Sequence, residues 1–163
     1  MTLQTYYVRP ATIEDAEMLA HQRTEMWLAM GVLSPDSIQK MRNESTIYFR
    51  EAIPKKDFMG WLIETKDKNI VAGGGLSLKI TPPMPNKQGI TQLTTLNAHI
   101  FNIFVEPIYR KQGLARLVMQ TIHDWCKENK VTILTLNASA EGRPLYRSMG
   151  YAEVNNFMRF FIS

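Results

Sequence analysis

Apolar positions along this chain repeat with two different periods, and the changes between them predict its helices and strands. Apolar residues at helical spacing predict helices near 12–31, 34–54, 113–129 and 142–149. Segments rich in β-branched and aromatic residues predict strands at 6–9, 58–65, 70–80, 98–105, 131–137 and 151–162. The presence of both element types along the whole length predicts one α/β domain, of the α+β type, spanning 1–163.

Local signals mark the ends of several predicted elements. Thr12 followed by Asp15 is a variant of the capping box that starts a helix. Ser34 followed by Pro35 marks the start of the second helix, because proline is favoured at the first helical position. Gly150 suits the left-handed position that follows the last helix.

The predicted strands at 58–65 and 70–80 form a hairpin around the turn 66–69. Glycines 73–75 interrupt the second strand, which is typical of a bulge or of a close approach to the backbone. The segment 81–95 contains three prolines, and loops of this length are often functional or mobile.

The predicted strand at 98–105 is apolar on both faces, as expected of a central strand that is covered on both sides. The helix at 113–129 carries an apolar stripe of Leu114, Leu117, Val118, Ile122 and Trp125. Together with the strand at 131–137, these elements predict a strand–helix–strand unit with a right-handed crossover.

Charge and cysteine content narrow the possible partners. The net charge of +4 and isoelectric point near 9.2 suit an anionic ligand, but no nucleic-acid recognition motif or long basic block occurs. The single cysteine, Cys126, excludes an intrachain disulfide and a cysteine-based zinc site, and we predict no metal. Neither a secretory signal nor an apolar run of membrane length occurs, which predicts a cytoplasmic protein.

The segment that joins the central strand to the following helix contains candidate chemistry. Helix-start amides lack acceptors within the helix and attract anions, and the small residues Gly113 and Ala115 let a ligand approach them. Arg110, Lys111 and Arg116 add positive charge. This pattern favours a phosphate or pyrophosphate site, although on spacing alone an ordinary turn with exposed basic residues explains it equally well.

This segment resembles a known signature. Residues 102–116 resemble the coenzyme A motif of the GNAT (GCN5-related N-acetyltransferase) superfamily, Arg/Gln-x-x-Gly-x-Gly/Ala after a strand end, with Ala115 in place of the more usual second glycine. Residues 137–151 resemble the second block of the family, in which a Leu-Tyr pair precedes a Gly-Phe/Tyr pair. Residues 8–15 and 70–78 match its opening and its glycine-containing strand.

The resemblance implies both a fold and a cofactor site. The fold is a central mixed, mostly antiparallel sheet of about six to seven strands flanked by about four helices. A splay between the strands at 98–105 and 131–137 would admit the pantetheine arm of acetyl-CoA. The residues implied in binding acetyl-CoA are Phe104, Val105, Arg110, Lys111, Gln112, Gly113, Leu114, Ala115, Arg116, Asn137 and Tyr146.

By the same resemblance, the chain is an acetyl-CoA-dependent N-acetyltransferase that acts directly on a primary amine of a small molecule or peptide. Tyr146 is expected to protonate the leaving thiolate, because a phenol is protonated at neutral pH. His99 is a candidate base and Asn102 a candidate for orienting substrate or water, with Glu25 and Glu141 as weaker candidates. Strand alternation predicts that His99 and Asn102 face opposite sides unless a bulge intervenes.

Two alternatives remain open from the sequence. A GNAT-like domain can bind acyl-CoA as a sensor or partner module without turnover, and a basic protein can bind nucleic acid, although no motif supports the second. We expect the acceptor site to lie among residues 24–54 and 81–95, which supply apolar and aromatic side chains. A homodimer is compatible with the resemblance, and no membrane partner is expected.

Overall fold

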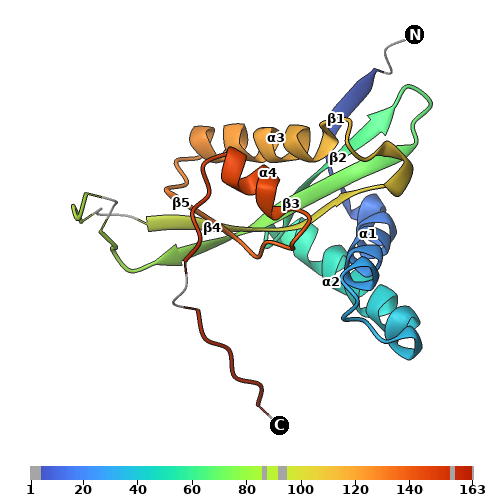
Figure 1. Cartoon of the computed structure of the whole chain (residues 1–163), viewed down its shortest axis with the longest axis horizontal. Helices are drawn as coiled ribbons and strands as arrows, with labels where there is room; N and C mark the ends of the chain where they lie inside the picture. The colour runs from blue at the N-terminus through green and yellow to red at the C-terminus, as the bar shows by residue number, and fades with distance from the viewer. Residues whose placement is uncertain (1–4, 86–87, 92–94, 155–156, 163) are drawn as a thin grey trace.

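The computed structural model describes residues 5–85, 88–91, 95–154 and 157–162. The strands are β1 (Tyr6–Pro10), β2 (Met59–Thr65), β3 (Ile70–Thr81), β4 (Thr95–Val105) and β5 (Ile133–Leu136). The helices are α1 (Ala16–Ala29), α2 (Ile38–Lys55), α3 (Leu114–Glu128) and α4 (Arg143–Ser148), with short 3-10 turns at Ile13–Asp15, Pro35–Ser37 and Pro107–Tyr109. Figure 1 shows the strands running side by side through the middle of the molecule.

The sheet is mixed and mostly antiparallel, as predicted. Its strand order is β1-β2-β3-β4-β5; neighbours are antiparallel except β5, which lies parallel to β4. The β4–β5 register runs only from Asn97 opposite Ile133 to Ile100 opposite Leu136. β4 continues to Val105 with β3 alone, so the predicted splay between these two strands is confirmed.

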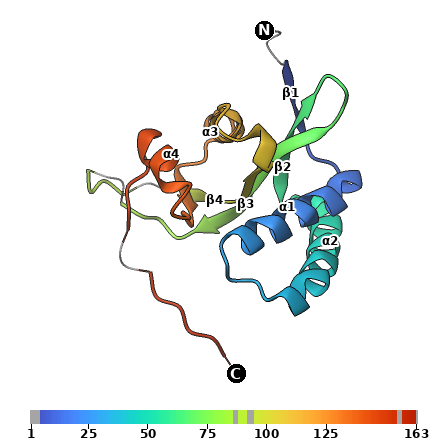
Figure 2. The same ribbon diagram turned by 45° about the vertical axis from the view of Figure 1, so that its right-hand side comes forward.

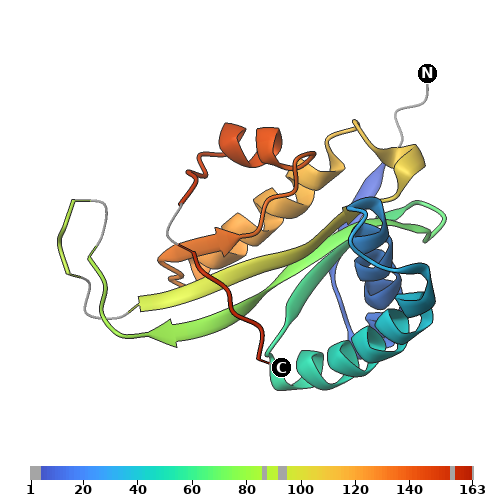
Figure 3. The ribbon, with the colours of Figure 1, turned by 60° about the horizontal axis from the view of Figure 1, so that its bottom comes forward.

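Helices cover both faces of the sheet. Figures 2 and 3 show α1 and α2 on one face and α3 with α4 on the other. The larger apolar core lies beneath α3, where Val118, Met119 and Ile122 are completely buried against the strands. A second core lies beneath α1 and α2 and centres on Phe49, Phe58 and Leu62.

An ionic network fixes the start of the domain. Asp15 accepts the backbone N–H of Thr12 at 2.8 Å, which confirms the predicted capping box. Arg9 on β1 donates to Asp15 and also to Glu64 on β2, so one guanidinium ties two strands to the start of α1. The hydrogen bond from Arg9 holds the pKa of Glu64 below its usual range.

Glycines 73–75 face a bulge in β4. The β3–β4 register shifts between Gly73, opposite Phe104, and Gly75, opposite Phe101, so the extra residue lies in β4 and the glycines mark the close approach that the sequence also allowed. Asn102, within the shifted stretch, has a left-handed φ of 61°. A Cβ at Gly74 would lie 2.3 Å from the Cδ1 of Ile103. The glycine run therefore permits β3 to lie against the bulged strand.

The C-terminal segment differs from its prediction. In the described parts, 151–154 and 157–162, no strand forms, so the sheet has five strands instead of six to seven. Phe157, Phe160 and Phe161 are exposed, and Figure 1 shows this end of the chain leading away from the sheet. The composition is suited to a strand, but a strand also needs a neighbouring backbone to pair with.

We predict that Gly75→Ala destabilises the protein by about 2–3 kcal/mol, because overpacking forces neighbouring atoms to move. The new methyl group would meet the carbonyl oxygen of Met59 and the Phe58 ring, each at 2.4 Å. Urea denaturation followed by circular dichroism measures the effect. Lys79→Ala, at an exposed position on the same strand, is the control; equal stabilities of the two variants would contradict the prediction.

Candidate active site

Two residues of the loop between β4 and α3 have a left-handed backbone conformation. Lys111 has φ 60° and Gly113 has φ 81°, and α3 begins immediately afterwards at Leu114. A Cβ at Gly113 would meet nothing within 4 Å, so only the backbone conformation calls for glycine there. Alternating backbone conformations of this kind form concave surfaces of amides that bind anions.

The amides of residues 111–116 are unpaired. None of them donates to a backbone or side-chain acceptor among the residues that the structure describes, and the first paired amide is that of Leu117, which donates to the carbonyl of Gly113 at 3.0 Å. The positive end of the α3 dipole reinforces these donors. The loop is therefore a place for an anionic group that accepts several hydrogen bonds.

Protein contacts hold most of the polar side chains of this loop. Arg110 turns back to donate to the Val105 carbonyl at 3.1 Å and lies over the Phe104 ring. Arg116 donates to Ser148 on α4 at 2.6 Å, and the Tyr6 hydroxyl donates to Gln112 at 2.6 Å. Arg110 and Arg116 therefore combine positive charge at the loop with links to β4 and α4.

The splay lies directly beside this loop. Beyond Ile100, the side of β4 that faced β5 has no strand partner in the described chain, while β3 still pairs with Phe104 and Val105. Asn137 follows the last residue of β5 and is exposed. The structure thus brings the predicted strand-end residues, Asn137 and the loop of unpaired amides to one end of β4.

Tyr146 lies on α4 with its ring packed against the α3-side core. The ring meets that of Tyr151 edge-on at 6.0 Å and crowds Gly142, where a Cβ would be 2.8 Å away. Its hydroxyl forms no hydrogen bond within the described residues. Burial raises the pKa of Tyr146, which keeps the phenol protonated at neutral pH and able to donate.

His99 and Asn102 lie on the same face of β4, because a bulge of the kind that the sequence prediction allowed for lies between them. The bulge that begins after Phe101 adds a residue and changes the alternation. His99 stacks beside Phe101 and bonds to the Thr135 hydroxyl at 2.9 Å, while burial lowers the pKa of His99. Asn102 is 1% exposed and donates to the Leu19 carbonyl of α1 at 3.2 Å.

The other candidate groups are occupied or buried. Glu25 pairs with Arg42 at 3.7 Å, and Glu141 lies 3.7 Å from Arg110. Cys126 is buried on the inner side of α3, and burial raises its pKa to about 11. Ion pairs thus occupy both carboxylates, and burial keeps the Cys126 thiol protonated.

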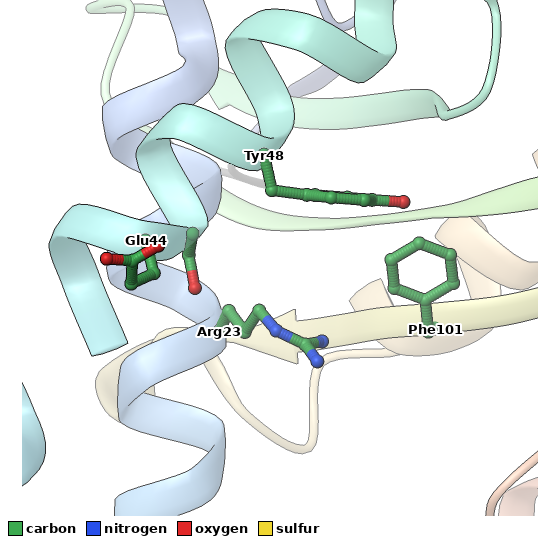
Figure 4. A pocket seen from close by; sticks show the side chains of 5 residues that line it. Arg23, Glu44, Tyr48 and Phe101 are labelled. Atoms are coloured by element: carbon green, nitrogen blue, oxygen red, sulfur yellow. The ribbon is translucent and has the colours of Figure 1, made fainter. Parts of the chain in front are cut away.

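A pocket that the sequence indicated only in part lies between α1, α2 and β4. It has a volume of about 410 Å³ and is lined by Arg23, Glu44, Ser45, Tyr48 and Phe101 (Figure 4). Tyr48 belongs to the predicted acceptor region, whereas Arg23 was missed. The available signal was its spacing: Arg23 lies four residues after Leu19 and four before Trp27, on the apolar side of α1.

The residues that the structure describes contain no group of three or more metal-binding side chains drawn from His, Cys, Asp and Glu. None of the described helices combines the length and apolar character needed to span a bilayer.

The sheet order, the splay and the unpaired amides before α3 are the features to compare with known folds. A family model described as "Acetyltransferase (GNAT) domain" matches residues 86–160. The crystal structure of a GCN5-related N-acetyltransferase from Ralstonia eutropha JMP134 superposes with a TM-score of 0.82, covering 96% of this chain and 99% of that one at 22% identity. Residues 86–160 are thus similar to the GNAT family, and the fold of the chain is that of a GCN5-related N-acetyltransferase.

Two other proteins are similar to the chain. A predicted acetyltransferase from Clostridium acetobutylicum, solved with acetyl-CoA, gives a TM-score of 0.80 at 22% identity and covers 96% of each chain. The [ribosomal protein bS18]-alanine N-acetyltransferase of Escherichia coli K12 is 36% identical over 67 residues. That match covers 39% of this chain and 45% of the relative, so it spans about half of the relative's length.

We predict that Asn102→Val lowers the free energy of unfolding by about 2–3 kcal/mol, because a β-branched residue is strained at positive φ and the bond to Leu19 is lost. Asn102→Gly is the matched variant, since it loses the same bond without the strain, and we expect it to cost about 1 kcal/mol. Chemical denaturation separates them. A glycine variant as unstable as the valine variant would argue against strain at the bulge.

Proposed function

We propose that this chain is an acetyl-CoA-dependent N-acetyltransferase that transfers the acetyl group directly to a primary amine of a small molecule or peptide. The observation that carries the proposal is the set of unpaired amides at 111–116 beside a strand that has lost its partner. A pyrophosphate needs several converging donors, and an extended arm needs free backbone to pair with. The two requirements are met side by side.

The fit assigns a role to each part of the site. Amides from Lys111 to Arg116 would hold the pyrophosphate, with Gly113 leaving them accessible. The pantetheine arm would lie in the splay, near the backbone of Phe104 and Val105 and beside Asn137. The Val105 carbonyl already accepts a hydrogen bond from Arg110. The backbone amide of Val105 is therefore the group of Val105 that is left to bond the pantetheine arm.

Bound acetyl-CoA supplies the acetyl group as a thioester, and transfer forms an amide C–N bond while the C–S bond breaks. His99 can accept the proton that the amine gives up, because its lowered pKa keeps the imidazole neutral near pH 7. Tyr146 can give its proton to the departing sulfur, because its raised pKa keeps the phenol protonated. Asn102 acts as a positioning residue that fixes the bulge against α1.

The acceptor is an amine of limited size. The pocket beside Phe101 opens on the face of β4 that carries His99, which supports this pocket as the acceptor site. The similarity to an enzyme named for acetylating an alanine of a ribosomal protein supports a peptide or an amino-acid-like amine among the acceptors.

We predict that Gly113→Val weakens acetyl-CoA binding at least roughly 100-fold, because a β-branched side chain cannot hold the left-handed backbone that exposes the amides. Gly89→Val is the matched control: Gly89 also has positive φ, 76°, and open space around it, but lies in the loop before β4. Calorimetry with acetyl-CoA measures both. Equal affinities for the two variants would refute the phosphate site.

We predict that Tyr146→Phe lowers kcat roughly 100-fold and leaves acetyl-CoA affinity nearly unchanged, because a general acid acts mainly in the chemical step. Tyr7→Phe, at an exposed position on β1, is the control. Release of coenzyme A with a panel of amines measures kcat. Acetyl-CoA binding without turnover of any amine would favour the sensor alternative, and full activity of Tyr146→Phe would remove its role as acid.

A further inference from the structure

Arg23 carries a charge that the described protein does not neutralise. It forms no ion pair and no hydrogen bond with any residue in the described ranges, although every other arginine described in α1, α2 and α3 has at least one such partner. Burial lowers the pKa of Arg23, yet a guanidinium stays charged at any physiological pH. A partly desolvated, unpaired cation is costly, so this position indicates an external anion.

Aromatic rings hold the guanidinium in place. Its Cζ lies 5.6 Å from the ring centroid of Trp27 and 5.9 Å from that of Phe101, which are cation–π distances. The indole N–H of Trp27 is buried and has no hydrogen-bond partner among the described residues. Figure 4 shows the guanidinium pointing from α1 toward Phe101 on β4. The group is therefore aimed at the strand beside the splay.

The remaining pocket residues limit the kind of anion. Glu44 lies on the same pocket, and among the lining residues Arg23 is the one cation. A dianionic phosphate would leave excess negative charge there, whereas a carboxylate balances one guanidinium and fits its planar pair of donors. An amine drawn to the pocket in its protonated form is compatible with the carboxylate of Glu44.

We propose that Arg23 binds a carboxylate of the acceptor, so that the substrate is an amine with a carboxylate a few bonds from the reacting nitrogen, as in an amino acid. The inference rests on the proposed function and narrows its acceptor. The short separation follows from Phe101, which contacts the guanidinium and lies two residues after His99 on the same face of β4. A neutral amine of the same shape would leave Arg23 unpaired.

The test compares free amino acids with their C-terminal amides as acceptors, using the full chain and saturating acetyl-CoA. We expect Arg23→Met to raise KM for the carboxylates roughly ten- to a hundred-fold, the loss expected for one charge-assisted pair, with little change for the amides. Arg23→Lys should be intermediate, because it keeps the charge and loses the fork. Arg50→Met, which removes an exposed arginine paired with Glu17, is the control and should change neither series.

A binding measurement keeps the proposal independent of turnover. N-acetyl amino acids and their amides are titrated separately, and binding is followed by the fluorescence of Trp27. We expect selective binding of the carboxylates. Arg23→Met should abolish this binding, and Trp27→Phe should remove the fluorescence change. Equal use or equal binding of acids and amides, or a preference that survives in Arg23→Met, overturns the proposal. Failure of acetyl-CoA to bind would instead refute the proposed function, and all Arg23 variants should bind acetyl-CoA like the parent protein.

Discussion

The whole arrangement depends on a single loss of pairing: β4 continues for several residues after β5 has stopped bonding to it. A strand interior with a free backbone edge is costly unless another chain, water or a ligand satisfies its polar groups. Here the free edge belongs to the part of β4 that ends at Val105, a few residues before the unpaired amides at 111–116. The unpaired strand edge and the unpaired amides therefore lie close together along the chain.

The bulge in β4 is the second irregularity of this strand, besides its unpaired edge. It accommodates Asn102 in a left-handed conformation, and the glycines of β3 make room for the displaced strand. Its effect is to turn Asn102 toward α1, the side of β4 on which His99 and Phe101 already lie. The face of β4 that would receive an acceptor is consequently richer in functional side chains than an uninterrupted strand would allow.

Much of the architecture could be predicted from local sequence. The capping residues, the glycine run and the strand–helix–strand unit each have a short-range physical signal, and the structure confirms them. The bulge at Asn102 escaped because it depends on the register between two strands, which no single segment encodes. Residues 151–162 escaped for the opposite reason: their composition suits a strand, but strand formation depends on a partner backbone elsewhere.

In the candidate site, too, local features could be predicted from the sequence and tertiary features could not. The loop at 110–116 could be proposed from the sequence because small residues, charge and a helix start coincide within a few positions. Arg23 was missed because its importance lies in what surrounds it in space: two aromatic rings from different elements and the absence of a carboxylate within reach among the described residues. Whether a charged side chain has a partner depends on the tertiary structure, so the spacing of residues in the sequence does not reveal it.

The burial of Cys126 has a practical consequence. With its pKa raised to about 11, the only cysteine of the chain holds almost no thiolate at neutral pH, and thiolate is the form that attacks sulfhydryl reagents. Colour developed by such a reagent during the proposed reaction would thus come from liberated coenzyme A, with the folded protein contributing almost none. Because Cys126 is buried, its labelling would also report unfolding that exposes the inner side of α3.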